Sequence, residues 1–255
     1  MKKALALVLA LLSPLAAQAA TECPQHYLGG REPSISNPSM RTKTRELCFS
    51  EYGSMWSGAS RTPLWSASHL TRDRVAASHG LPRTNDFHEE TRLSPEDRSW
   101  MSDFSRSGFD RGHVAPNGDM SNPASQSESF SLANMVPQVA ENNRGIWAGI
   151  ESTVRDLASR SGEVWVVTGP VFSGSTLRTT PSRRVFVPTH MFKAIYVPST
   201  GQSGVYLSPN DTSGSWTPIS VDQLATMTGF DPFPGLSSGR SVSMALPQPR
   251  GRTQY

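Results

Sequence analysis

Four chemically distinct residues lie side by side near the middle of the chain. The run Asp110-Arg111-Gly112-His113 places a carboxylate, a guanidinium, a residue without a side chain and an imidazole within four positions. If this segment is extended, Arg111 and His113 point to the same side, because alternate residues of a strand share a face. An imidazole accepts a proton near neutral pH, and a guanidinium binds phosphate or carboxylate. The spacing therefore predicts a base beside an anion-binding group, with Gly112 leaving room for a bulky substrate.

The strongest helical pattern in the chain follows, over residues 143–160. Apolar residues recur every three or four positions and predict one buried helix face: Ile146, Ile150, Val154 and Leu157. Positions four residues apart drift by only about 40° per step and form a ridge beside that face: Asn143, Trp147, Glu151 and Arg155. An amide and a carboxylate on one ridge suit a hard divalent cation. Asn142, the rival amide, lies about 100° off the ridge. An ordinary ion pair between Glu151 and Arg155 would explain part of the same spacing without a metal.

Together these segments resemble the DNA/RNA non-specific endonucleases. Residues 109–116 (FDRGHVAP) are similar to the DRGH signature of that family, which includes the Serratia-type secreted nuclease and mitochondrial endonuclease G. Further matches follow in register at residues 134–138 (NMVPQ), 143–151, 168–170 (TGP) and 228–233 (TGFDPF). The similarity extends over residues 63–236 and implies a nuclease domain with a ββα-metal core.

The resemblance also implies a role for each matching residue. His113 would be the general base that deprotonates the attacking water. Asn143 would be the one direct protein ligand of Mg²⁺, for which Mn²⁺ would substitute, and Glu151 would hydrogen-bond the water molecules around the ion. Arg83, within residues 82–87 (PRTNDF), would stabilise charge on the phosphate. Arg111 would assist at the catalytic centre, and two residues would support the metal and substrate: Asn134 and Arg155.

Phosphodiester hydrolysis needs these residue types. A base activates water, a cation stabilises the departing 3′ oxygen, and fixed donors neutralise the phosphoryl oxygens. The resemblance implies that DNA and RNA are both substrates and that the products carry 5′-phosphate and 3′-hydroxyl ends. We expect low sequence specificity, because phosphate contacts position a substrate without reading its bases.

The composition is that of a globular domain rich in turns. The 255 residues are 36% apolar and 18% charged, with 20 Gly and 20 Pro, which argues against a coiled coil, a collagen-like chain or a polytopic membrane protein. Strands are predicted at residues 63–70, 109–115, 163–172, 185–197 and 205–207, and a helix at 221–228 between a Ser220 cap and Gly229. Without regular βαβ alternation, this order predicts an α+β fold. The resemblance adds a mixed or antiparallel sheet with flanking helices.

The first 19 residues have the pattern of a cleaved signal peptide. Lys2 and Lys3 precede an apolar run over residues 4–12, and Ala17-Gln18-Ala19 is a small-residue cleavage pattern. The apolar run is too short to span a bilayer. We therefore expect an exported protein, periplasmic or secreted, without a membrane segment after cleavage. Cleavage would also remove two of the charges that make up the formal net charge of +3.

The two ends of the mature chain are predicted to be irregular. Residues 20–62 are rich in Ser, Pro and Arg and predict an N-terminal arm, and residues 237–255 predict a flexible tail. Cys23 and Cys48 both lie in the arm. In an oxidising compartment, an isolated pair of cysteines predicts a disulfide.

Two other functions fit parts of the sequence. An exported nucleic-acid-binding module without catalysis would keep the arginines but would not need both His113 and Asn143. A serine hydrolase is suggested by residues 235–239 (GLSSG), which fit G-x-S-x-G, but Pro-rich segments flank them where a strand and a helix are required. The sequence does not settle DNA against RNA preference, the physiological metal or the oligomeric state.

Overall fold

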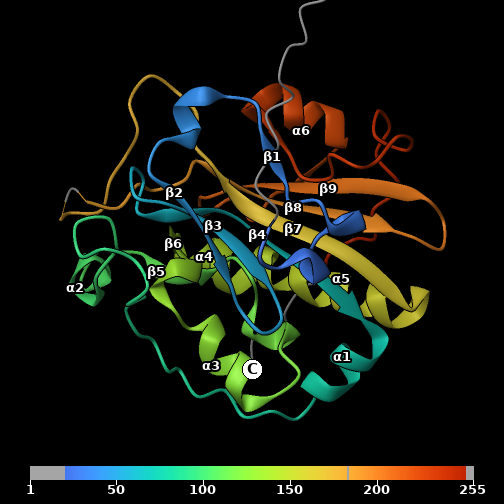
Figure 1. Ribbon diagram of the computed structural model, residues 1–255, viewed down its shortest axis with the longest axis horizontal. Helices are drawn as coiled ribbons and strands as arrows, with labels where there is room; N and C mark the ends of the chain where they lie inside the picture. Colours follow the sequence, from blue (N-terminus) through green and yellow to red (C-terminus); the bar gives the residue numbers. More distant parts are fainter. Residues whose placement is uncertain (1–20, 183, 251–255) are drawn as a thin grey trace, which may run out of the picture.

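The computed structural model describes residues 21–182 and 184–250 (Figure 1). The predicted signal peptide, residues 1–19, lies outside these ranges, as do the last five residues of the predicted tail. None of the helices in the described ranges combines the length and apolar character needed to cross a bilayer.

The centre of the molecule is a seven-stranded antiparallel sheet in the order β10, β9, β8, β7, β4, β3, β2. The strands are β2 (Thr44–Cys48), β3 (Gly53–Ser57), β4 (Thr62–Thr71), β7 (Glu163–Val171), β8 (His190–Val197), β9 (Gln202–Pro209) and β10 (Thr217–Ile219). The strands predicted at 63–70, 163–172 and 205–207 are confirmed. Only the second half of the strand predicted at 185–197 forms, as β8.

Two short strand pairs lie outside this sheet. β5 (Asp110–His113) pairs with β6 (Met135–Gln138), and β1 (Ser34–Ile35) pairs with β11 (Phe230–Asp231). The helices are α1 (Arg72–Ser78), α2 (Met101–Phe104), α3 (Pro123–Ser129), α4 (Ala140–Asn142), α5 (Ala148–Ser161) and α6 (Val221–Thr228). The 3₁₀ turns are Pro24–His26, Leu28–Gly30, Pro38–Arg41, Asn117–Asp119 and Leu132–Asn134, and a π-helical turn spans Asn143–Trp147. The predicted α+β class is confirmed.

The sheet buries side chains on both faces, because successive residues of a strand point to opposite sides. Along β7, Val167 belongs to the core beneath α6, whereas Val164 and Val166 belong to the core beneath α5. Figure 1 shows α6 and α5 on opposite sides of the sheet. The β5–β6 pair lies on the α5 side, where β6 adds Val136 to that core.

The ends of α6 follow the sequence signals. The hydroxyl of Ser220 accepts a hydrogen bond from the backbone N–H of Gln223, whose side chain accepts one from the backbone N–H of Ser220. Gly229 closes the helix with φ 68°, a left-handed conformation that glycine adopts without strain.

The N-terminal arm is more regular than predicted. Residues 20–62 contain β2 and β3, which extend the central sheet, so the expectation of a wholly irregular arm is wrong. β2 is an edge strand, and its polar residues Arg45 and Glu46 conceal the apolar alternation that would identify a strand. The predicted Cys23–Cys48 disulfide is present and joins the start of the arm to the last residue of β2.

The predicted flexible tail also packs on the core over residues 237–250, although it forms no helix or strand there. The backbone N–H of Met244 donates to Ser203 O at 2.7 Å, and the hydroxyl of Tyr206 donates to Pro247 O at 2.8 Å. Leu246 is buried, and Arg250 pairs with Asp156 of α5 at 3.0 Å. Buried apolar contacts and main-chain hydrogen bonds therefore hold a segment whose composition alone predicts disorder.

Candidate active site

A cavity of about 600 Å³ lies between β5, the Asn117–Asp119 turn and the start of α5. It brings together six of the seven residues that the sequence singled out for catalysis, metal binding or substrate support: Arg83, Arg111, His113, Asn143, Glu151 and Arg155. The seventh, Asn134, does not line this pocket.

β5 forms one wall of the pocket. Arg111 and His113 both line it, as their alternate positions predict. Gly112 points the other way, toward β6, where an added Cβ would lie 2.1 Å from Oε1 of Gln138. Glycine is therefore required here by the close packing of β5 on β6. The expectation that Gly112 makes room for substrate is wrong.

The His113 side chain is only 8% exposed and packs against two aromatic rings. Its ring centroid lies 4.8 Å from that of Phe130 and 5.8 Å from that of Phe87. Its Nε2 is buried and has no hydrogen-bond partner among the described residues. Burial, followed by the positive charges of Arg83 and Arg111, lowers the pKa of His113 to about 3. The imidazole is therefore neutral near pH 7 and able to accept a proton.

The two arginines nearest His113 are held by aromatic rings and amides. The Arg111 guanidinium carbon lies 4.0 Å from the centroid of Phe87, and that of Arg83 lies 5.1 Å from the centroid of Phe130. Arg83 also donates to Oδ1 of Asn85 at 2.7 Å and of Asn117 at 2.9 Å. Both cations are thereby positioned beside the imidazole.

The side-chain amide of Asn143 is oriented by the carboxylate of Asp110. Its Nδ2 donates to Asp110 at 2.9 Å, which leaves the amide oxygen as the group that can coordinate a cation. Arg144 donates to both oxygens of Asp110, at 2.8 and 2.5 Å. Burial acts to raise the pKa of Asp110, but the hydrogen bonds from Arg144 and Asn143 outweigh it and lower the pKa. Asp110 is therefore a structural partner of the predicted metal ligand.

The predicted ridge is interrupted by a π-helical turn. Gly145 has φ −99° and ψ −109°, outside helical values, and the Asn143–Trp147 turn takes up an extra residue. Trp147 consequently turns into the core, fully buried, with the Lys193 ammonium 5.5 Å from its ring centroid. The ridge is correct for Asn143, Glu151 and Arg155 but wrong for Trp147, which does not line the pocket.

Two buried asparagines brace the backbone around the pocket. Asn142 accepts from Gln138 at 2.6 Å and donates to Ser208 Oγ and Pro209 O, both at 2.8 Å. Asn134 accepts from the backbone N–H of Ala115 at 2.8 Å and donates to Ala115 O at 2.8 Å. Asn134 thus fixes the chain just after His113.

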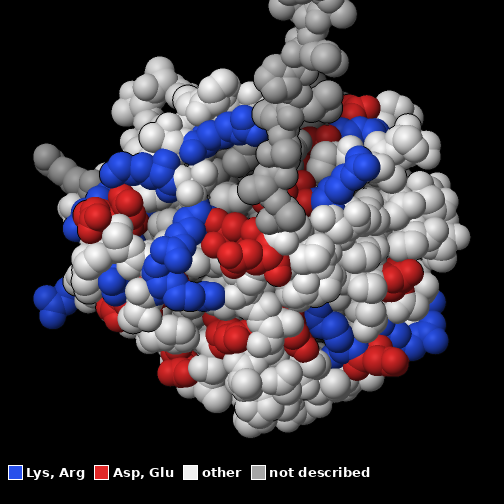
Figure 2. Space-filling view, viewed as in Figure 1, with Lys and Arg blue, Asp and Glu red and all other residues white. Residues whose placement is uncertain are grey.

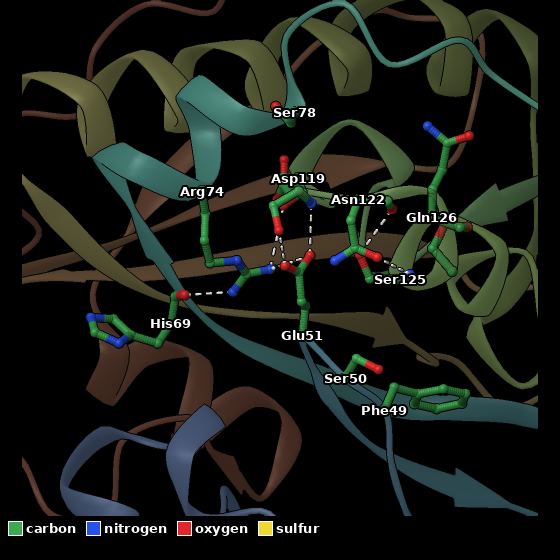
Figure 3. A network of polar contacts seen from close by, with 12 residues as sticks. Phe49, Ser50, Glu51, His69, Arg74, Ser78, Asp119, Asn122, Ser125 and Gln126 are labelled. Carbon is green, nitrogen blue, oxygen red and sulfur yellow. Dashed lines mark hydrogen bonds and ion pairs between the residues drawn. The ribbon is translucent and has the colours of Figure 1, made fainter.

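A polar network that the sequence does not predict anchors the Asn117–Asp119 turn, which forms a second wall of the pocket, and Figure 3 shows its members Glu51, Arg74 and Asp119. Arg155 donates to Oδ1 of Asp119 at 2.8 Å, next to the pocket residue Gly118. The backbone oxygen of Asp119 accepts from Arg74 of α1 at 3.3 Å, and Arg74 pairs with Glu51 at 3.4 Å. Glu51 also accepts from the backbone N–H and hydroxyl of Ser121.

Glu51 remains ionised in this network. Burial acts to raise its pKa, but the hydrogen bonds from Ser121 and the charge of Arg74 outweigh it and lower the pKa. The Asn117–Asp119 turn is therefore anchored from beneath, while its ends hold two pocket arginines. Asn117 contacts Arg83, and Asp119 contacts Arg155.

The oxygen donors in the pocket suit a hard cation that keeps most of its water. They include the amide oxygen of Asn143 and the carboxylate of Glu151, whereas the side-chain oxygens of Asp110 and Asn117 accept from arginines. Among the described residues, the one cluster of three His, Cys, Asp or Glu side chains close enough to share an ion is Cys23, Glu46 and Cys48. Its two cysteines form the disulfide, so it does not compete as a metal site.

Charge on the surface is mixed. On the face seen in Figure 2, basic and acidic side chains are interspersed, in keeping with the small formal net charge. We therefore attribute attraction of an anion to the arginines of the pocket rather than to the overall charge of the protein.

The serine-hydrolase motif does not form a nucleophile elbow. Ser237 follows the two-residue strand β11 after a Pro-containing loop, and no helix follows it in the described part of the tail. A nucleophile elbow requires a strand before the serine and a helix after it. This alternative is therefore not supported.

The chain is similar to known nucleases. Nuclease C1 of Cunninghamella echinulata var. echinulata is 34% identical over 193 residues, covering 67% of this chain and 77% of that protein. Mitochondrial nuclease EXOG of Homo sapiens is 27% identical over 216 residues, covering 76% of this chain and 58% of EXOG. The chain thus spans less than two thirds of the human relative.

The fold has a solved counterpart. A chain in the crystal structure of the EndoG/EndoGI complex matches with a TM-score of 0.68 at 29% identity, covering 72% of this chain and 84% of that one. The expected ββα-metal nuclease fold is thereby confirmed. Residues 32–239 match the model of the DNA/RNA non-specific endonuclease family. The chain therefore belongs to that family.

Proposed function

We propose that this chain is an exported, metal-dependent endonuclease that hydrolyses the phosphodiester bonds of DNA and RNA. The observation that carries the proposal is the neutral His113 imidazole in one pocket with Arg83 and Arg111. Family membership supports the same chemistry.

His113 acts as the general base that takes a proton from the attacking water. Before substrate binds, Arg83 and Arg111 help to hold its pKa near 3, where the imidazole is a weak base. A phosphate bound to these arginines cancels part of their positive potential, which raises the pKa of His113. The imidazole therefore becomes a stronger base when the substrate is in place.

Arg83 and Arg111 bind the phosphoryl oxygens and offset the charge that develops on them. Their cation–π contacts and the amides around Arg83 hold the donors in place before substrate arrives. Arg155 keeps positive charge at the far side of the pocket. Phosphate contacts of this kind do not read bases, which suits a nuclease of low specificity.

Asn143 and Glu151 are the residues that would hold the divalent cation, Mg²⁺ or Mn²⁺. When bound, such an ion offsets charge on the scissile phosphate and on the departing 3′ oxygen. Asp110 keeps the amide oxygen of Asn143 available for such an ion, and Glu151 would accept hydrogen bonds from the water around it. The products expected are 5′-phosphate and 3′-hydroxyl ends.

The Cys23–Cys48 disulfide supports export, since such bonds persist in oxidising compartments. Residues 1–19 would be the signal peptide, so the active form begins at residue 20 and is periplasmic or secreted.

The direct test incubates purified residues 20–255 with supercoiled plasmid or RNA, in Mg²⁺ or EDTA. Cleavage of both substrates in Mg²⁺ but not in EDTA, with 5′-phosphate ends, is the expected result. Binding of plasmid without cleavage at any metal concentration would instead favour the non-catalytic binding module.

A further inference from the structure

A second groove continues from the active-site pocket along β5. It has a volume of about 590 Å³ and shares Asp110 and Arg111 with the first pocket, so the two are contiguous. Its remaining lining comes from α2 and the loop after it: Met101, Ser102, Phe104, Ser105, Arg106 and Phe109. Whatever occupies the active site can therefore extend into this groove.

Three side chains at alternate positions connect the two spaces. His113 lines the first pocket, Arg111 lines both, and Phe109, just before β5, lines the second. His113 and Arg111 are alternate residues of β5 and share a face, whereas Phe109 lies in the bend just before the strand. A base, a cation and an aromatic ring therefore line the two spaces in chain order.

The groove combines an apolar wall with cations. Met101 and Phe109 are only partly buried, so their apolar surfaces are accessible, while Phe104 lies behind them. Arg106 is exposed at the groove, and the guanidinium carbon of Arg178 lies 5.4 Å from the centroid of Phe109. Aromatic rings beside a positively charged track are the means by which proteins bind single-stranded nucleic acid without sequence preference.

We propose that this groove binds the unstacked base of a nucleotide next to the scissile phosphate, with the base against Phe109 and Met101 and the neighbouring phosphate at Arg111 and Arg106. The inference rests on the proposed nuclease function and adds the form of the substrate. A base inside a duplex is paired and stacked, so it must leave the helix to enter the groove. Single-stranded or distorted segments therefore bind better than regular duplex.

The test measures binding separately from cleavage. His113→Ala protein is titrated, in EDTA, against a fluorescent single-stranded oligonucleotide, an abasic strand of equal length and a matching duplex. Adding Phe109→Ala is expected to weaken binding of the normal strand about tenfold, with little change for the abasic strand or the duplex. Phe109→Leu, which keeps apolar volume without a ring, replaces the alanine variant if that variant does not fold.

Phe172→Ala is the matched control. The Phe172 ring contacts Phe186, 6.0 Å between centroids, and lines neither groove. Unchanged binding by the Phe109 variants, or equal losses on normal and abasic strands, would overturn the inference. Its failure is distinguishable from that of the proposed function. If the wild type cleaves and the Phe109 variants bind the normal strand as tightly as their parent, only the proposed base-binding groove is rejected. If binding depends on the Phe109 ring but the wild type does not cleave, only the proposed nuclease function is rejected.

Discussion

Two walls of the pocket differ in how their ionisable side chains are held. On the β5 wall, His113 is buried against Phe87 and Phe130, with a bare Nε2 among the described residues. On the second wall, Arg155, Asp119, Arg74 and Glu51 form a continuous chain of ion pairs and hydrogen bonds. A bare buried nitrogen costs stability, whereas linked ion pairs and hydrogen bonds resist displacement, even though Nε of Arg74 has no partner among the described residues.

The contrast indicates that one wall serves the chemistry and the other serves the structure. The β5 wall presents a neutral imidazole to the pocket, and the second wall holds the turn that contacts Arg83 and Arg155. Changes on the first wall should therefore alter chemistry more than folding. Changes on the second should alter folding more than chemistry.

The largest effect is expected at His113. His113→Ala removes the general base, and we expect turnover of plasmid and RNA to fall about 10²- to 10⁴-fold. Initial rates of plasmid nicking measure this, with circular dichroism and the thermal midpoint reporting on the fold. Wild-type turnover by a folded His113→Ala protein would contradict the assignment.

Substitutions in the network beneath the Asn117–Asp119 turn should lower mainly the stability of the protein. Arg74→Met removes the charged partner of Glu51, whose carboxylate keeps its hydrogen bonds from Ser121, and is expected to cost about 2 kcal/mol of unfolding free energy. Urea denaturation measures the loss, and turnover per folded molecule should change only a few-fold.

A double variant checks that this loss comes from the pair. Adding Glu51→Gln to Arg74→Met should cost less than the sum of the two single changes. Strict additivity would show that Arg74 and Glu51 act independently and would remove the basis for calling this wall a network.

The neighbouring residues Asn142 and Asn143 allow the effects on stability and on chemistry to be compared at adjacent positions. Asn142→Ala breaks buried hydrogen bonds to Gln138 and Ser208 and should lower stability by about 1–3 kcal/mol. Asn143→Ala should leave stability nearly unchanged but raise the Mg²⁺ concentration needed for half-maximal cleavage. Magnesium titrations of both variants, at matched folded fractions, separate them, and equal shifts would argue against Asn143 as the ligand.

The last effect is a slope of stability against pH. His113 has a pKa near 6.5 when unfolded and about 3 when folded. As pH falls from 6.5 toward 3, the unfolded chain binds a proton that the folded protein does not, so stability falls by up to about 1.4 kcal/mol per pH unit. Above pH 6.5 this residue contributes no slope.

His113→Gln should therefore be less sensitive to acid than the wild type. Urea unfolding at pH 7, 5.5 and 4.5 measures the difference, which cancels the shared contributions of His26 and His190, whose pKa values are also lowered by burial. Parallel pH dependence in the two proteins would indicate that His113 is not held neutral by its surroundings.

The residues of the β5 wall could be predicted from sequence because their geometry is local. Arg111 and His113 are two positions apart on an extended segment, so their shared face follows from the strand alone. Glu151 and Arg155 are four apart in a regular part of α5, and they too share a face. The resemblance to a family supplied Arg83, which no local period connects to the others.

The network beneath the Asn117–Asp119 turn could not be predicted from local sequence spacing. Glu51 and Arg74 are 23 residues apart, and Arg74 and Asp119 are 45 apart, so no sequence period links them. A regular helix would place Trp147 on the ridge, but the π-helical turn directs it into the core, and the full burial of Asn134 is a tertiary property that its motif does not reveal. Both features depend on packing between distant segments, which overrides local pattern.

The π-helical turn at Asn143–Trp147 makes this stretch sensitive to length as well as composition. Removing Gly145 would convert the turn to ordinary α-helix and rotate what precedes it by about 100° relative to α5. Either Trp147 would leave the hydrophobic interior, or the amide of Asn143 would swing away from Glu151. A single-codon deletion here would therefore be more damaging than most side-chain replacements, and sequence alignments of relatives are best anchored on this interval without gaps.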